Sequence, residues 1–343
     1  MREIGAGMML WPNATRVLRH MHLLARLAAN KDASTHFLVR ASSGKILMKI
    51  ALGNFEVPAI CVRRADLLNT LLAALPEEQI RLGYEFSGLE HSHERVTVRF
   101  TNGQELEHDA IIGADGLRSR VRQALFGKSD PIYRGYQVWR GIGEYHGRAI
   151  PEHANSETWG IGQRFGILRI GQGRFTWYAT ANLPADHVET DRKTDLKRLF
   201  SAWHAPILDL IDSTPDENIL RHPAYDNVPL PRWGRDRVTL LGDAAHPCTP
   251  NLGQGGCMAL EDALVLAQCV RAVKSIEPAL RRYEKLRQSR TRHVQQRSLL
   301  MGRIGQWQNR AIVGGRHVVT NLLPARIFEY NLRRLYSYRS LAS

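Results

Sequence analysis

The sequence predicts an α/β fold in which a parallel-sheet domain is interleaved with an antiparallel-sheet domain and followed by C-terminal helices. Residues 238–241 form an apolar run typical of a buried strand, and a glycine-rich loop and a helical pattern over 258–273 follow it. Residues 133–183 alternate in polarity and are rich in aromatic and β-branched side chains, as in an antiparallel sheet. Because the buried strand comes after this sheet, the two domains interleave along the chain.

Local patterns predict the remaining elements. Helices are expected where apolar residues recur at helical spacing, at 13–29, 67–75 and 196–211. Strands are expected where short apolar or alternating runs end in turns, as a pair within 36–60 around a turn at 42–44, and at 60–62, 96–100 and 110–112. A hairpin turn is expected at 171–173. The sequence shows no internal repeat and no low-complexity linker between these elements.

Length and composition are those of an ordinary globular protein. The chain has 343 residues, of which 43% are hydrophobic, enough for two domains with sizeable cores. It contains no apolar stretch of transmembrane length, and its start lacks the pattern of a secretory signal. The four cysteines (Cys61, Cys248, Cys257 and Cys269) show no Cys-x-x-Cys spacing, so neither a metal site nor a disulfide is expected. We therefore expect a soluble, cytoplasmic protein with reduced cysteines.

The net charge of +14 is concentrated near the C-terminus. Residues 271–343 contain 16 Lys and Arg residues against the three acids Glu277, Glu284 and Glu329. We expect a solvated basic face on helices that pack against the rest of the protein. Peripheral contact with an anionic membrane surface is the alternative. Nucleic acid is not expected as a partner, because this region has no recognisable motif for reading bases.

The segment 242–256 combines three features that suit one kind of ligand. Asp243 follows the buried strand directly, where a carboxylate can accept hydrogen bonds from sugar hydroxyls. Gly253, Gly255 and Gly256 allow the backbone to approach a flat ring closely. The start of the following helix presents N–H groups and a positive dipole to developing negative charge. These features suit a ligand that is polyhydroxylated, planar and able to become anionic, and a flavin has all three properties.

Five motifs, in order along the chain, resemble a known family. They are Glu-Ile-Gly-Ala-Gly at 3–7, Trp-Pro-Asn-Ala at 11–14, Arg-Ala-Asp-Leu at 64–67, Ile-Gly-Ala-Asp-Gly-Leu-Arg-Ser at 112–119, and Gly-Asp-Ala-Ala-His-Pro with Asn-Leu-Gly-Gln-Gly-Gly within 242–256. The chain resembles the FAD-dependent aromatic hydroxylases of the p-hydroxybenzoate hydroxylase type, which are class A flavoprotein monooxygenases. It is most similar to the salicylate, 6-hydroxynicotinate and urate hydroxylases and to the zeaxanthin epoxidase-like branch.

The resemblance implies a reaction and a division of the chain. NADH or NADPH would reduce FAD, and the reduced flavin would react with O₂ to a C4a-hydroperoxyflavin that hydroxylates or epoxidises an aromatic or conjugated substrate. The FAD-binding, Rossmann-like domain would comprise 1–33, 60–127 and 233–275, and the substrate-binding sheet domain 34–59 and 128–232. Residues 276–343 would form the basic C-terminal helical region.

The resemblance also implies site residues. Flavin contacts are expected from Arg64, Asp115, Gly242, Asp243, Pro250, Leu252, Gly253, Gly255 and Gly256. Pro250, expected against the edge of the flavin ring, and Arg164 are the candidate catalytic residues. Arg164 falls near a functional arginine of urate-type relatives, and a strand-edge charge is the alternative for it.

Three further positions limit what can be carried over from those relatives. Thr176 falls near their substrate-contacting tyrosine, with Trp177 and Tyr178 one and two positions further on, so urate specificity is not transferred. His246 is expected to orient its turn rather than to transfer protons. The segment 8–11, which supplies a catalytic histidine in some relatives, is apolar here, and no general base is identified.

One family landmark is absent from the sequence. The family opens with a βαβ unit that carries a Gly-x-Gly-x-x-Gly turn for the FAD pyrophosphate, and no such turn precedes Gly5-Ala6-Gly7. An upstream start codon or a fragment is expected, and a non-catalytic remnant that cannot retain FAD is the alternative. A relative of the flavin-dependent halogenases or reductases is a further alternative, although no motif specific to a halogenase is present.

Overall fold

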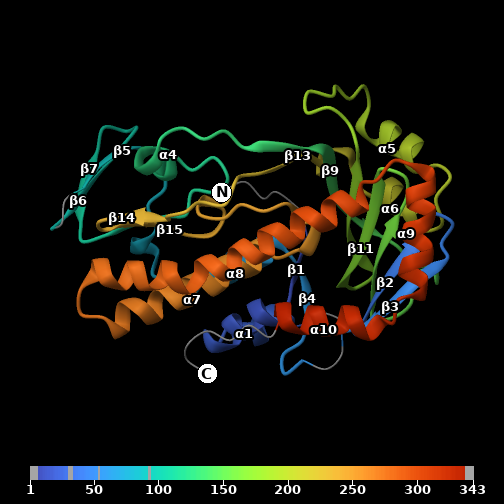
Figure 1. Ribbon diagram of the computed structural model, residues 1–343, viewed down its shortest axis with the longest axis horizontal. Helices are drawn as coiled ribbons and strands as arrows, with labels where there is room; N and C mark the ends of the chain where they lie inside the picture. Colours follow the sequence, from blue (N-terminus) through green and yellow to red (C-terminus); the bar gives the residue numbers. More distant parts are fainter. Residues whose placement is uncertain (1–6, 30–33, 53–54, 92–93, 337–343) are drawn as a thin grey trace. The chain divides into compact units, whose positions relative to one another are not determined.

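A computed structural model describes residues 7–29, 34–52, 55–91 and 94–336 (Figure 1). The motif at 3–7 therefore lies outside the described residues except for Gly7. The chain forms two compact units that interleave in sequence. The sheet unit comprises the described residues of 1–73, 134–224 and 302–338, and the loop unit those of 74–133 and 225–301. The predicted interleaved α/β fold is confirmed, while the functional division into three regions stays a prediction.

The sheet unit is built on a seven-stranded sheet in the order β13-β9-β12-β11-β10-β2-β3. Its strands are β2 (His36–Ala41), β3 (Ile46–Ala51), β9 (Ile132–Glu144), β10 (Ala154–Trp159), β11 (Gln163–Gly171), β12 (Arg174–Ala181) and β13 (Leu220–Asp226). The hairpins predicted around 42–44 and 171–173 are both present as antiparallel pairs. One pair, β2 with β10, is parallel.

One face of this sheet forms the core of the unit. Trp139, Phe165 and Trp177 are buried there together with Phe200 and Ile211 of two helices, α5 (Arg192–Phe200) and α6 (Ile207–Ser213). The prediction of one continuous helix over 196–211 is wrong, because the residue before a proline is disfavoured in helical conformation and Pro206 restarts the helix as the N-cap of α6.

The first and last segments of the sheet unit add a small antiparallel pair and several helices. β1 (Gly7–Leu10) pairs with β4 (Ile60–Arg63), as expected for the extended segment 60–62. The helices are α1 (Pro12–His20), α2 (Leu24–Ala28), α3 (Arg64–Leu72), α9 (Arg310–Leu322) and α10 (Ala325–Tyr336). The single helix predicted over 13–29 is interrupted, because His22 adopts a left-handed φ of 60°. Trp11 and Tyr336 stack with ring centroids 4.3 Å apart, which ties α10 to the start of α1.

The loop unit contains the predicted strand, loop and helix. β8 (Ile111–Gly113) and β15 (Val238–Leu240) run parallel, and β14 (Gly234–Arg235) pairs with β15. A separate three-stranded sheet consists of β5 (Phe86–His91), β6 (Val96–Phe100) and β7 (Glu105–His108). The helices are α4 (Arg120–Phe126), α7 (Gly255–Ala272) and α8 (Ile276–Gly305), and α7 and α8 lie alongside each other (Figure 1). Within the described residues, no helix combines the length and the apolar character needed to cross a bilayer.

Candidate functional site

The turn after β15 presents Asp243 to solvent. Gly242 has a φ of +61°, in the left-handed region that favours glycine, and an added Cβ there would lie 3.3 Å from the Cβ of Ala259. The chain therefore reverses directly at the carboxyl end of the buried strand. The exposed Asp243 follows at the position where parallel-sheet proteins hold their ligands.

The start of α7 lies next to this carboxylate. Gly253 has a left-handed φ of 59°, and α7 begins two residues later at Gly255. A Cβ added to Gly255 would lie 3.7 Å from Oδ1 of Asp243. The N-cap residue of α7, Gln254, makes no side-chain hydrogen bond to the first turn of this 18-residue helix, whose N-terminal end carries a partial positive charge. The Asp243 carboxylate and the positive end of α7 thus lie next to each other.

A buried network of ion pairs and hydrogen bonds around Asp262, here called the brace, holds this turn. Asp262 on α7 accepts hydrogen bonds from the backbone N–H of Gly242 at 3.1 Å and from Nε of Arg287 at 2.6 Å, and it pairs with Nε2 of His246 at 2.5 Å. Asp262 and Arg287 have no exposed surface. His246 therefore orients the turn, as expected, although its partner is a carboxylate on the following helix.

The brace extends to a second acid. Arg287 on α8 also donates to Oε2 of Glu261 at 2.6 Å, and Arg290 donates to Oε1 of Glu261 at 3.1 Å. Sequence reasoning missed this network, since Asp262 and Arg287 are 25 positions apart. The adjacent acids Glu261 and Asp262 within a mostly apolar helix were the one available signal.

The pH dependence of stability should report on this brace. Burial alone would raise the pKa of Asp262, but His246 and Arg287 outweigh it and hold that pKa below its ordinary value. A carboxyl whose pKa is lower in the folded chain stabilises the fold above its unfolded pKa, and this contribution is lost as the pH falls through the folded pKa. We expect the free energy of unfolding to decline below about pH 4. Urea unfolding midpoints measured from pH 7 down to pH 3 test this, and a smaller decline is expected in Asp262→Asn.

Helix α8 also supports the loop that precedes α7. Ser298 donates to the carbonyl of Thr249 at 2.6 Å and accepts, through its own carbonyl, from Nδ2 of Asn251 at 3.0 Å. Gln295 donates to the carbonyl of Pro247 at 3.0 Å. The loop is thereby fixed on one side, while Pro250 remains exposed on the other.

Asp115 acts as a helix cap. Its carboxylate accepts from the hydroxyl of Ser119 at 2.5 Å and from the backbone N–H groups of Arg120 and Val121 at 2.7 and 3.1 Å. These bonds satisfy the first turn of α4. The buried Arg122 in the same helix donates to the carbonyl of Ala244 at 2.8 Å, which links this turn to the turn that carries Asp243.

The sheet unit carries a second set of candidate residues on the face opposite its apolar core. Side chains alternate along a strand, so Arg140 and Tyr178, which lie opposite each other in the register of β9 and β12, point away from the buried Trp139 and Trp177. Thr176 shares this face and accepts from the backbone N–H of Gly7 at 3.1 Å. The polar face therefore lies across β9, β12 and β11.

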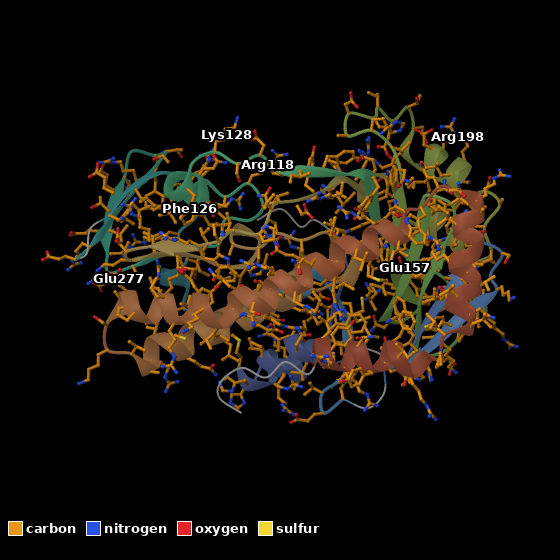
Figure 2. The ribbon with its side chains drawn as sticks, in the orientation of Figure 1. Arg118, Phe126, Lys128, Glu157, Arg198 and Glu277 are labelled. Atoms are coloured by element: carbon orange, nitrogen blue, oxygen red, sulfur yellow. The ribbon has the colours of Figure 1, made fainter. Side chains whose placement is uncertain are left out.

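Arg164 is a buried, ion-paired member of this polar face. Its Nη1 lies 3.0 Å from Oε1 of Glu157 on β10, and its Nε donates to Gln306 at 3.0 Å. Figure 2 labels Glu157 on the sheet. Burial works against the charge of Arg164, but Glu157 together with Tyr136 and Tyr178 raises its pKa above the ordinary value. Burial and the same glutamate raise the pKa of Tyr178 well above normal, so its hydroxyl stays protonated. The strand-edge alternative for Arg164 does not match this environment.

Arg140 and Arg64 of the sheet unit have no acidic partner among the described residues. Arg140 is half-buried, and burial and the neighbouring charge of Arg64 lower its pKa. Arg64 is exposed at the start of α3, while Arg63 forms the ion pair with Asp66 at 2.6 Å. This part of the sheet unit therefore suits a negatively charged oxygen.

Comparison with known proteins identifies the family. Residues 7–298 match the family model described as an FAD binding domain. The chain belongs to the FAD-dependent monooxygenase family. Aurachin C monooxygenase/isomerase of Stigmatella aurantiaca is 38% identical over 312 residues, which cover 90% of this chain and 81% of that protein.

Other relatives differ from this FAD-dependent monooxygenase in length, and their names refer to different molecules. A chloroplastic zeaxanthin epoxidase of an Oncidium hybrid cultivar is 36% identical over 241 residues, covering 67% of this chain and only 36% of the epoxidase. The crystal structure of Klebsiella pneumoniae HpxO complexed with FAD and uric acid superimposes with a TM-score of 0.91 at 27% identity. That match covers 98% of this chain and 89% of the other.

These findings confirm the predicted family and cofactor, and they do not support the alternative of a non-catalytic remnant. Eight of the predicted cofactor residues lie in the loop unit: Asp115, Gly242, Asp243, Pro250, Leu252, Gly253, Gly255 and Gly256. Arg64 and Arg164 lie in the sheet unit. The flavin contacts of these residues, and the catalytic roles of Pro250 and Arg164, stay predictions.

Proposed function

We propose that the protein uses NADH or NADPH and O₂ to hydroxylate or epoxidise an aromatic or conjugated substrate with bound FAD. The observation that carries the proposal is the exposed Asp243 carboxylate beside the glycine-lined start of α7. This pair offers an acceptor for hydroxyl groups and a positive helix end for negative charge within one small space.

The residues of the loop unit fit a flavin. Asp243 would hold the hydroxyls of the ribityl chain, and the backbone at Gly253 and Gly255 would accept the ring without steric hindrance from a Cβ. The N–H groups of the first turn of α7 would stabilise negative charge on the reduced ring system. FAD, once bound, would supply the electron transfer and the oxygen chemistry that no side chain provides. Pro250 would exclude water beside the reacting edge.

Arg140 favours a substrate with an anionic or strongly polarised oxygen. It is half-buried on the polar face of the sheet unit, and burial lowers its pKa. A negatively charged oxygen would compensate for this desolvation. A phenol-like substrate bound as its anion would be activated for attack by an electrophilic oxygen, without a general base from the apolar segment 8–11. The named activities of the relatives, on aurachin C, zeaxanthin and urate, are compatible with a conjugated or heteroaromatic substrate.

Replacing Arg140 with methionine should weaken substrate use without affecting the cofactor. A hydrogen bond to a charged group contributes about 1.5–3 kcal/mol to binding free energy. Its loss should therefore lower kcat/KM by about 10- to 100-fold. Steady-state oxidation of NAD(P)H with the best substrate measures this. The exposed Arg198→Met serves as the matched control, and an unchanged kcat/KM in Arg140→Met would refute the role.

Isotope labelling tests the reaction itself. The FAD-loaded protein is incubated under ¹⁸O₂ with NADH or NADPH and with each member of a panel of phenols, heteroaromatics and polyenes. The masses of the products are then measured by mass spectrometry. We expect one labelled oxygen atom in the product for each reductant consumed. A product whose new oxygen atom carries no label, and so comes from water, contradicts the proposal. Reductant consumption that yields only hydrogen peroxide with every compound also contradicts it.

Cellular location belongs to the same proposal. The four cysteines are free, and Cys61, Cys257 and Cys269 are buried. Burial and the nearby carboxylates of Asp243 and Asp226 raise the pKa of the half-buried Cys248 thiol well above its ordinary value. Unreactive free thiols suit a reducing compartment, so we propose action in the cytoplasm. Peripheral membrane contact through 271–343 is the alternative.

A further inference from the structure

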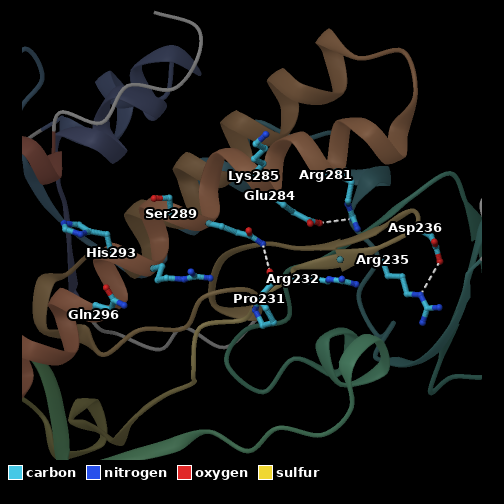
Figure 3. A pocket seen from close by; sticks show the side chains of 13 residues that line it. Pro231, Arg232, Arg235, Asp236, Arg281, Glu284, Lys285, Ser289, His293 and Gln296 are labelled. Carbon is cyan, nitrogen blue, oxygen red and sulfur yellow. Dashed lines mark hydrogen bonds and ion pairs between the residues drawn. The ribbon is translucent and has the colours of Figure 1, made fainter.

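A basic groove in the loop unit is not used by the site described above. It has a volume of about 780 Å³ and runs between the segment before β15 and one side of α8 (Figure 3). Its lining includes five arginine or lysine side chains against two acids: Arg232, Arg235, Arg281, Lys285 and Arg292 against Asp236 and Glu284. The volume lies within the range of small-ligand sites, about 300–1,000 Å³.

The two acids of the groove are already engaged. Glu284 accepts from the hydroxyl of Thr239 at 2.7 Å and pairs with Arg281 at 2.8 Å. Asp236 pairs with His91 at 2.6 Å. It also lies 3.8 Å from Arg235, and Figure 3 draws this second pair. Both carboxylates are therefore already hydrogen-bonded or ion-paired to other residues of the loop unit.

The remaining cations are available to a ligand. Arg232, Lys285 and Arg292 are exposed and form no ion pair among the described residues. Lys285 and Arg292 are seven residues apart on α8, about 10 Å at 1.5 Å per residue, and Arg232 lies on the opposite wall. Three separated positive charges around one hollow suit an extended anion with more than one charge.

We propose that this groove binds the pyrophosphate of a soluble nucleotide. Two linked phosphate groups can engage cations on both walls at once, which a single carboxylate cannot do. Among the described lining residues there is no large exposed apolar side chain, so the groove lacks the anchor that a membrane surface would engage. NADH and NADPH belong to this ligand class, and their assignment to the groove rests on the proposed function.

Calorimetric titration of the FAD-loaded protein with inorganic pyrophosphate and with ADP tests the proposal. We expect both to bind, more weakly as the salt concentration rises, because exposed charges are screened. The double variant Lys285→Glu with Arg292→Glu should weaken binding by about 10-fold or more. Arg282→Glu is the matched control, since it reverses an exposed charge on the same helix outside the groove. The neutral pair Lys285→Gln with Arg292→Gln should give an intermediate loss.

Several results would overturn the proposal. Absence of pyrophosphate binding, or equal affinity in the reversed pair and in Arg282→Glu, would do so. Binding of phosphatidylglycerol vesicles without binding of pyrophosphate would assign the groove to a membrane instead. The proposed function is judged separately: ¹⁸O transfer without pyrophosphate binding refutes the groove alone, and pyrophosphate binding without ¹⁸O transfer refutes the reaction alone.

Discussion

Replacing Asp262 with asparagine should lower the free energy of unfolding by about 3–5 kcal/mol, the usual cost of breaking a buried ion pair on one side. The substitution removes the carboxylate that pairs with Nε of Arg287, a side chain with no exposed surface, and leaves that guanidinium its pair with Glu261. It also removes the charged acceptor that His246 and the N–H of Gly242 share. The turn that presents Asp243 should therefore loosen together with the fold.

Urea unfolding followed by circular dichroism measures this loss. The matched control is Asp212→Asn, which removes an acid from the exposed pair with Lys197 and should leave the unfolding midpoint nearly unchanged. A loss below about 1 kcal/mol in Asp262→Asn would show that the brace contributes no more than a surface pair.

Replacing Asp243 with alanine should lower FAD affinity by about 10- to 100-fold, the value of one hydrogen bond to a charged group. Asp243 is exposed, so the fold should be retained. Flavin fluorescence titration gives the dissociation constant. Asp109→Ala, which removes another exposed acid of the loop unit, should bind FAD as the unaltered chain does. Equal FAD affinities in the two variants would show that Asp243 does not contribute to flavin binding.

Local sequence patterns were sufficient for the strand, loop and helix around Asp243. A buried strand, a glycine turn and a helix follow from neighbouring residues alone. The structure starts α7 at Gly255 instead of residue 258, and it ends both β15 and α7 one residue earlier than predicted. The breaks at His22 and before Pro206 were missed because amphipathic spacing continues through them. Single left-handed residues and proline starts interrupt a helix without changing that spacing.

Tertiary partners could not be predicted from spacing. Whether Thr176 or Trp177 faces the polar side of the sheet depends on register, and the structure buries Trp177 in the apolar core while Thr176 contacts Gly7. The ion pair between Arg164 and Glu157 arises from the pairing of β10 with β11, and the brace from the packing of α7 against α8. The motifs identified the residues of the turn, but not those that hold it in place.

Retention of FAD by the purified chain decides whether it is a flavoprotein. The purified protein is incubated with excess FAD, passed through a desalting column, and its visible spectrum is compared with the protein concentration. We expect a yellow protein with about one flavin for each chain, and clearly less flavin in Asp243→Ala. A folded protein that is colourless both as this chain and with the upstream in-frame codons restored would contradict FAD binding.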